Sequence, residues 1–149
     1  MYRIIILLIF SVLMANDYNY SLIDINPSST TYNQMIGPNY FTGSISIHYF
    51  GKQTWDLCTA KVGNLNDIYQ NLLSQGINNV KIIAIGKEEW ESGNGSWTDS
   101  NSIPVVIDPT PYTIWMDWGN VNLRDLIFLD AEGKYFTHYN ISNDSVFLS

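Results

Sequence analysis

The segment from residue 44 to residue 85 shows in turn the patterns of a strand, a helix and a second strand, and it constrains the fold more than any other part of the chain. Residues 45–49 alternate between apolar and polar side chains, which is typical of a strand. From about Cys58, apolar residues recur every three or four positions up to Gly76, which we expect to cap a helix. Residues 80–85 are nearly all apolar, as in a strand covered on both faces. This order predicts a βαβ unit with parallel strands and a right-handed crossover.

The remaining segments predict how this unit is extended into an α/β fold. A turn at Ala131-Glu132-Gly133 separates two apolar runs, which indicates an antiparallel hairpin. Residues 87–102 are polar, so we expect a loop there. We also expect an extended segment at 103–107, followed by one or two helical turns at 111–118 with Pro111 as the first helical residue. The hairpin strands are expected at 125–130 and 134–141. A C-terminal helix is expected to start near 142–144 and to be truncated at residue 149. This order of elements is typical of a thioredoxin-like fold.

The first fifteen residues have the pattern of a secretory signal peptide. Arg3 is a short basic region, residues 4–14 are almost wholly apolar, and Ala15 is a small residue suited to cleavage. The apolar run is short for a membrane span, although Leu13 at the −3 position leaves an uncleaved anchor as the alternative. We therefore expect a secreted or periplasmic protein that has no stable membrane association after cleavage.

Beyond the signal peptide, the pattern predicts one domain with an N-terminal extension. Residues 16–43 are polar and aromatic, and we expect them to pack on the domain with a short strand at 20–25. Residues 44–149 carry the thioredoxin-like pattern. The whole chain has 14 acidic and 7 basic residues, and its formal charge of −7 argues against a nucleic-acid partner, which requires a basic surface.

The titratable and sulfur-containing residues are few. Cys58 is the only cysteine, so no intramolecular disulfide can form, and its thiol is either a buried small apolar group or a reactive one. His48 and His138 are the only histidines and lack metal-ligand spacing, so we expect no metal site. The acidic segment 88–101 lacks the EF-hand spacing, which favours a solvated loop over a calcium site.

Several short motifs together resemble the active-site region of the thioredoxin-like superfamily. They are Tyr49-Phe50-Gly51 at the end of a strand, Cys58 at the start of a helix, Val62-Gly63-x-Leu65 and Asp67-Ile68-Tyr69 on that helix, Ile103-Pro104-Val105, and the hairpin sequence that begins at Asp125. The chain most closely resembles the thioredoxin-like domain of selenoprotein P and related exported bacterial redoxin proteins. The resemblance extends from about Tyr20 to Ile141.

The resemblance implies a thiol or selenol oxidoreductase site at positions 55 and 58. In that family a helix opens with Cys-x-x-Cys, or with selenocysteine in the first position, and here the matching residues are Trp55-Asp56-Leu57-Cys58. Cys58 matches the resolving position and Trp55 stands in the position of the nucleophile. The implied partners are protein thiols and disulfides or small oxidants, with no cofactor. A second departure is that no proline occurs near Arg124-Asp125, where thioredoxins have a cis-proline.

These departures leave three interpretations of Cys58. It is a buried inert thiol, the centre of a one-cysteine redox site, or the partner of a selenocysteine that has been decoded or replaced as Trp55. The third is open because the tryptophan codon UGG differs by one base from UGA, which encodes selenocysteine in this family. Two functions follow as hypotheses, an oxidoreductase and a redox-inactive binding module that keeps the thioredoxin fold. Asp56 is expected to interact with the helix N-terminus rather than to act as a base.

Overall fold

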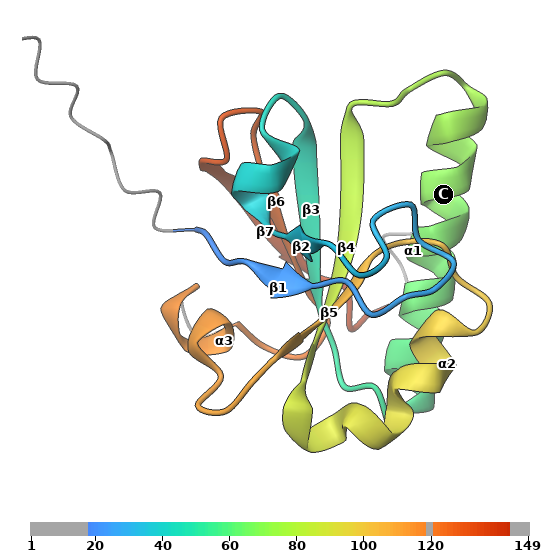
Figure 1. The fold of residues 1–149 in the computed structure, drawn as a ribbon, viewed down its shortest axis with the longest axis vertical. Helices are drawn as coiled ribbons and strands as arrows, with labels where there is room; N and C mark the ends of the chain where they lie inside the picture. The colour runs from blue at the N-terminus through green and yellow to red at the C-terminus, as the bar shows by residue number, and fades with distance from the viewer. Residues whose placement is uncertain (1–17, 119–120, 144–149) are drawn as a thin grey trace, which may run out of the picture.

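The computed structural model describes residues 18–118 and 121–143, which form a central mixed β-sheet between two layers of helices (Figure 1). The strand order is β5-β4-β3-β6-β7. The strands are β3 (Ile45–Phe50), β4 (Val80–Lys87), β5 (Val105–Asp108), β6 (Asp125–Leu129) and β7 (Tyr135–Asn140). β3, β4 and β5 are parallel to one another, whereas β6 and β7 are antiparallel to their neighbours.

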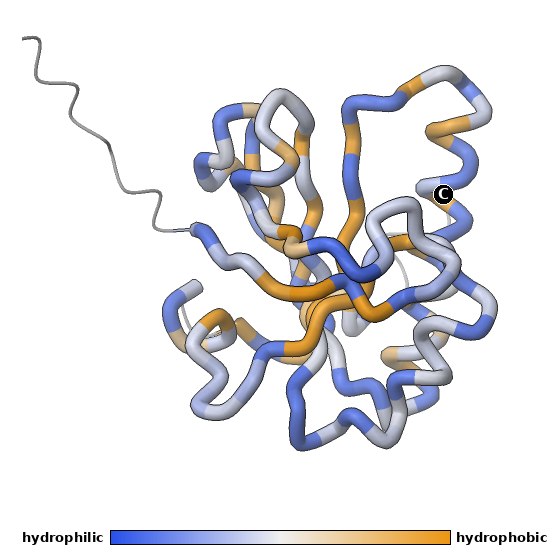
Figure 2. The backbone as a smooth tube through the Cα atoms, in the orientation of Figure 1, coloured by the Kyte–Doolittle hydropathy of each residue, from blue (hydrophilic) through white to orange (hydrophobic). Residues whose placement is uncertain are grey.

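The predicted βαβ unit is confirmed. Helix α1 (Asp56–Ser74) connects β3 to β4, and it begins two residues before the expected start at Cys58. The predicted hairpin is also confirmed, as β6 and β7. Figure 2 shows that hydrophobic residues are concentrated along the central strands, as expected for strands that are covered on both faces.

The sheet has a separate hydrophobic core on each face, because neighbouring residues of a strand point to opposite sides. Tyr49 of β3 packs with α1 and with α2 (Asn94–Thr98) in one core. Phe50, the next residue, packs on the other face against Trp115 of α3 (Thr113–Asp117). Figure 1 accordingly shows α1 and α2 on one side of the sheet and α3 on the other.

Two expectations about the second half of the chain are wrong. Most of the segment 87–102 is not a solvated loop, because residues 88–98 form the 3₁₀ helix η2 (Glu88–Gly93) followed directly by α2. The cause is Trp97, which is fully buried against Tyr49 with 5.9 Å between the ring centroids. Pro111 is not the first residue of a helix, because α3 starts at Thr113 after a left-handed Tyr112.

The N-terminal extension passes along the outer edge of β5. It contains the short strands β1 (Leu22–Ile23) and β2 (Met35–Ile36) and the 3₁₀ helix η1 (Pro38–Phe41), so the expected strand at 20–25 is shorter than predicted. The N–H of Ile25 donates to the carbonyl of Val105. The Val105 N–H in turn donates to the carboxylate of Asp24. These bonds satisfy the main-chain groups of Val105 at the outer edge of β5.

Two predictions concern residues outside the described part of the chain. The signal peptide at residues 1–15 precedes the first described residue, and most of the expected C-terminal helix follows the last one. Within residues 18–118 and 121–143, no helix combines the length and the apolar character that crossing a membrane requires.

Candidate functional site

Positions 55 and 58 lie in the first turn of α1, where the chain leaves the carboxyl end of β3. Trp55 is the N-cap residue, with extended dihedral angles, and Cys58 is the third residue of the helix. The N–H of Cys58 donates to the carbonyl of Trp55 at 2.9 Å. The structure therefore brings the two residues together at a helix N-terminus, where unpaired N–H groups favour a negative charge.

The side chain of Cys58 is fully buried. It is a free cysteine with no exposed surface, and it packs with Val62, Leu65 and Trp97. The hydroxyl of Tyr49 donates a hydrogen bond to the carbonyl of Cys58 at 3.4 Å. A reagent can reach this sulfur only if the first turn of α1 opens.

Trp55 is the exposed member of the pair. Its side chain is 44% exposed, and the neighbouring Leu57 is 64% exposed, so the turn presents an apolar surface to solvent. The ammonium of Lys52 lies 4.7 Å from the centre of the Trp55 ring, a cation–π contact. Indole has no nucleophilic atom that could begin a disulfide exchange, so the chain with Trp55 cannot complete a two-cysteine cycle.

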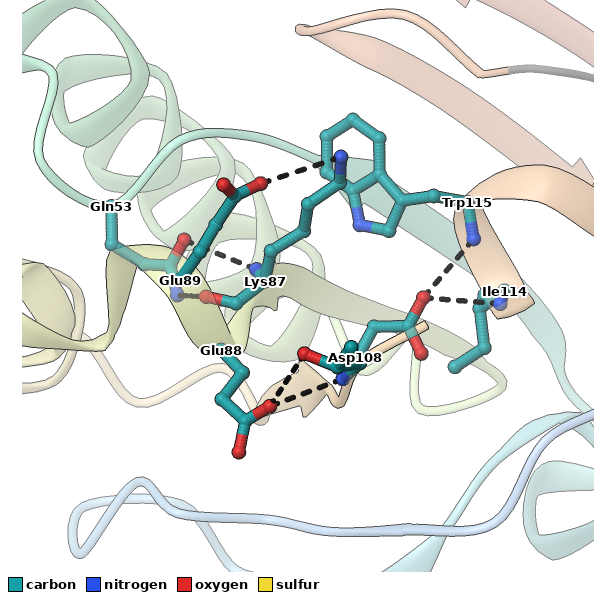
Figure 3. A network of polar contacts seen from close by, with 8 residues as sticks. Gln53, Lys87, Glu88, Glu89, Asp108, Ile114 and Trp115 are labelled. Carbon is teal, nitrogen blue, oxygen red and sulfur yellow. Dashed lines mark hydrogen bonds and ion pairs between the residues drawn. The ribbon is translucent and has the colours of Figure 1, made fainter. Parts of the chain in front are cut away.

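A polar network beside this turn connects the loop before α1 to the end of β4 (Figure 3). Gln53, which is almost fully buried, donates to the carbonyl of Lys87 at 3.0 Å and accepts from the Lys87 N–H at 3.3 Å. The Lys87 ammonium lies 4.7–5.0 Å from the ring centres of Trp90, Tyr112 and Trp115. It also pairs with Glu89 at 3.7 Å. This network fixes the carboxyl end of β4 against the loop that leads to α1.

Asp108, the partner of Lys87 across β4 and β5, fixes the start of α3. One oxygen of its carboxylate accepts hydrogen bonds from the N–H groups of Ile114 and Trp115 at 3.0 and 3.2 Å. The other oxygen is buried and has no hydrogen-bond partner in the described part of the chain. Burial raises the pKa of Asp108, and the two N–H bonds and Lys87 offset this in part.

Arg124 lies at the position that matches the cis-proline of thioredoxins. Its φ of 70° is left-handed, and its N–H donates to the carbonyl of Phe50 at 2.7 Å. Proline has no N–H and could not make this bond, which joins the end of β3 to the start of β6. Burial raises the pKa of Tyr49, with a further contribution from Cys58, and the charge of Arg124 lowers it in part.

The histidines lie away from this site. His48 is fully buried on the opposite face of the sheet, between the hydroxyls of Tyr20 and Ser46 at 3.0 and 2.9 Å. His138 lies on β7 and contacts the hydroxyl of Tyr135. Within the described residues there is no group of histidine, cysteine or acidic side chains that could bind a metal ion.

Sequence reasoning missed the residues that support the site from other elements. Nothing in the sequence indicates that Gln53 bonds to Lys87 or that Tyr49 contacts Cys58, because both pairs are brought together by the tertiary fold. The only available signal was that Lys87 and Asp108 end neighbouring parallel strands, whose carboxyl ends meet at one edge of a sheet.

Gly86→Ala is expected to destabilise the protein by about 1–3 kcal/mol, the usual cost of overpacking a close-packed site. A Cβ at this position would lie 2.2 Å from the side-chain amide of Gln53, which would have to leave its bonds to Lys87. Urea unfolding measures the change. Gly63→Ala is the matched control, because nothing lies within 4 Å of its added Cβ, and in a helix we expect it to stabilise by about 0.5–1 kcal/mol. An equal effect of the two substitutions would contradict the assigned role of Gln53.

Comparison with known proteins identifies the fold. The sequence matches no protein-family model and no curated protein. It is similar in structure to a thiol:disulfide interchange protein of the thioredoxin family from Chlorobium tepidum, with a TM-score of 0.64 and 12% identity over 82% of each chain. It is also similar to the pneumococcal exposed lipoprotein thioredoxin of Streptococcus pneumoniae (TM-score 0.62, 16% identity, 81% of this chain and 87% of that one).

A third similar structure is a secreted disulfide oxidoreductase of Mycobacterium tuberculosis, with a TM-score of 0.60 and 14% identity over 87% of each chain. At these identities the likeness shows the fold alone. The chain has a thioredoxin-like fold, and the predicted fold class is confirmed.

Proposed function

We propose that this chain is an exported thioredoxin-fold domain of the thiol or selenol oxidoreductase type, with the attacking position at residue 55 and the resolving position at Cys58. The observation that most supports it is the location of these residues in the first turn of α1, beyond the carboxyl end of β3. Ligand and reaction sites of open α/β sheets lie at this edge. The kinship that we propose within the superfamily is with the thioredoxin-like domain of selenoprotein P.

The chemistry is thiol–disulfide exchange. A chalcogenolate at residue 55, or the Cys58 thiolate alone, attacks one sulfur of a partner disulfide; a mixed disulfide forms and the second sulfur leaves as a thiolate. When both positions carry a chalcogen, Cys58 attacks the mixed disulfide, releases the reduced partner and leaves the bond between 55 and 58 oxidised. No cofactor takes part. The partners we propose are protein thiols and disulfides or small oxidants.

The location that we propose is extracytoplasmic. The pattern of a signal peptide at residues 1–15 supports it. Among similar structures, one is named as a secreted disulfide oxidoreductase and another as an exposed lipoprotein thioredoxin, which agrees with the same location.

A second candidate function is a binding module. The observation that favours it is the combination of a fully buried Cys58 with an exposed Trp55 that has no nucleophilic atom. On this alternative, the apolar surface of Trp55 and Leu57 docks a partner without turnover.

Reaction of the native protein with oxidised glutathione separates the two functions. The oxidoreductase is expected to gain one glutathionyl adduct at Cys58 in native buffer, through opening of the first turn of α1. Mass spectrometry detects the adduct, and the urea-unfolded protein serves as the control for thiol reactivity. An adduct that forms only after unfolding would support the binding module.

The codon for residue 55 tests the selenol version independently. UGA followed by a selenocysteine-insertion hairpin in the message is the result that this version expects. UGG with no such hairpin would remove decoding as the origin of Trp55 and leave Cys58 as the only reactive group.

A further inference from the structure

A cavity of about 340 Å³ with a partly polar lining lies beside the amino-terminal half of β4, and no residue of the 55–58 turn lines it. One wall comes from the N-terminal extension, at Thr30 and η1, and the others from β4 and from Tyr69 of α1. Pro104, the residue before β5, lies at its end. This volume is within the range of pockets that bind small molecules.

Pro104 opens this cavity because it stops the pairing of β5 with β4. The N–H of Ala84 donates to the carbonyl of Pro104, so the main chain of Ala84 faces β5. Two residues earlier, the main chain of Ile82 faces the same way, because main-chain groups alternate in direction along a strand. The next bond of the ladder would run from the N–H of residue 104 to the carbonyl of Ile82. Proline has no N–H, so the carbonyl of Ile82, a residue that lines the cavity, lacks a β5 partner.

The side-chain groups of the cavity that have no partner can all donate hydrogen bonds. Lys81 is its only charged lining residue, and within residues 18–118 and 121–143 its ammonium makes no ion pair. The side-chain hydroxyls of Thr30, Ser44 and Tyr69 likewise have no hydrogen-bond partner in that part of the chain. Partial burial raises the pKa of Tyr69, so its hydroxyl stays protonated at neutral pH and can donate.

We propose that this cavity binds a small hydroxycarboxylate. The carboxylate of the ligand accepts from the Lys81 ammonium and the lining hydroxyls, and the hydroxyl of the ligand donates to the Ile82 carbonyl. A cation is disfavoured because Lys81 is the one charge in the lining, and a purely apolar ligand would leave the lysine and the hydroxyls unpaired. The site is independent of the redox function proposed above, since it shares no residue with the 55–58 turn.

Calorimetric titration of the intact protein with lactate, acetate and inorganic phosphate at constant ionic strength tests the proposal. Lactate is expected to bind saturably, and acetate more weakly, because acetate lacks the hydroxyl that donates to Ile82. Lys81→Gln should weaken lactate binding at least about tenfold, the usual effect of losing one charge-assisted hydrogen bond. Lys134→Gln removes the same charge from an exposed lysine on the hairpin and should leave binding unchanged.

Pro104→Ala tests the role of the Ile82 carbonyl. The alanine N–H can complete the ladder and occupy this acceptor, so we expect lactate binding to weaken while the midpoint of thermal unfolding is kept or raised. The proposal is overturned if no probe binds saturably, if Lys81→Gln and Lys134→Gln have equal effects, or if acetate or phosphate binds as tightly as lactate. The same holds if Pro104→Ala binds lactate as tightly as the unsubstituted protein.

Discussion

Trp55→Cys is expected to convert this protein into a working two-cysteine oxidoreductase. Residue 55 is the N-cap of α1 and Cys58 lies three residues further on, so their Cβ atoms are neighbours on one side of the first turn. This arrangement is compatible with the spacing that a disulfide needs. The helix N-terminus and the ammonium of Lys52, 4.7 Å from the present ring centre, both favour a thiolate at position 55.

The redox activity gained by Trp55→Cys is measurable in two ways. A cysteine in such a motif has a pKa of about 3.5–7.5 against about 8.5 for a free thiol, so its alkylation at neutral pH should be about tenfold faster than that of a free thiol. On oxidation both thiols should disappear together, and insulin reduction by dithiothreitol should rise above its uncatalysed rate. Trp55→Ser removes the indole without adding a thiol and serves as the matched control.

The double substitution Trp55→Cys with Cys58→Ser separates attack from resolution. It should keep the fast alkylation but accumulate a stable mixed disulfide in place of turnover, because no second thiol can release the partner. If Trp55→Cys alone also stops at the mixed disulfide, Cys58 is not in the resolving position and the proposed redox function fails.

The sequence predicted the fold where a segment is long enough to show a period. The nineteen residues of α1 and the eight of β4 carry their patterns within themselves, and so does the hairpin turn at Gly133. The segment from Glu88 to Thr98 carries no such pattern, because η2 and α2 are only six and five residues long and a helical period cannot appear in so few residues. Burial of Trp97 in the core stabilises that segment, and this contact is tertiary.

The candidate site was likewise predictable from the sequence only in part. Trp55 and Cys58 could be placed at the start of a helix because the strand pattern ends before residue 55 and the helix pattern begins near Cys58. The contact of Tyr49 with Cys58 joins different elements, and the fixing of Gln53 against the end of β4 depends on the absence of a side chain at Gly86. Such contacts have no sequence period, so only the folded structure reveals them.

His48 is expected to make the protein lose stability as the pH falls below 6.5. Burial lowers the pKa of His48 from 6.5 to about 3, so the native imidazole stays neutral where the unfolded chain takes up a proton. The contribution to stability is fully present above pH 6.5 and declines at about 1.4 kcal/mol per pH unit below it. Between pH 6.5 and 4.5 the contribution of His48 to the free energy of unfolding should therefore fall by about 2–3 kcal/mol.

Urea unfolding of the unsubstituted protein, His48→Gln and His138→Gln across this pH range isolates the contribution of His48. Glutamine does not titrate, and its amide can still bond to the hydroxyls of Tyr20 and Ser46, so His48→Gln should flatten the decline whatever its effect on stability at pH 7. His138→Gln changes an exposed histidine and should leave the slope as it is. The opposite contribution of Asp108, whose pKa is raised by burial, is present in every variant and cancels in the comparison. If the free energy of unfolding falls with the same slope in all three proteins, His48 is protonated in the native state and the prediction is wrong. The buried position of His48 between Tyr20 and Ser46 does not permit that protonation unless this face of the sheet opens.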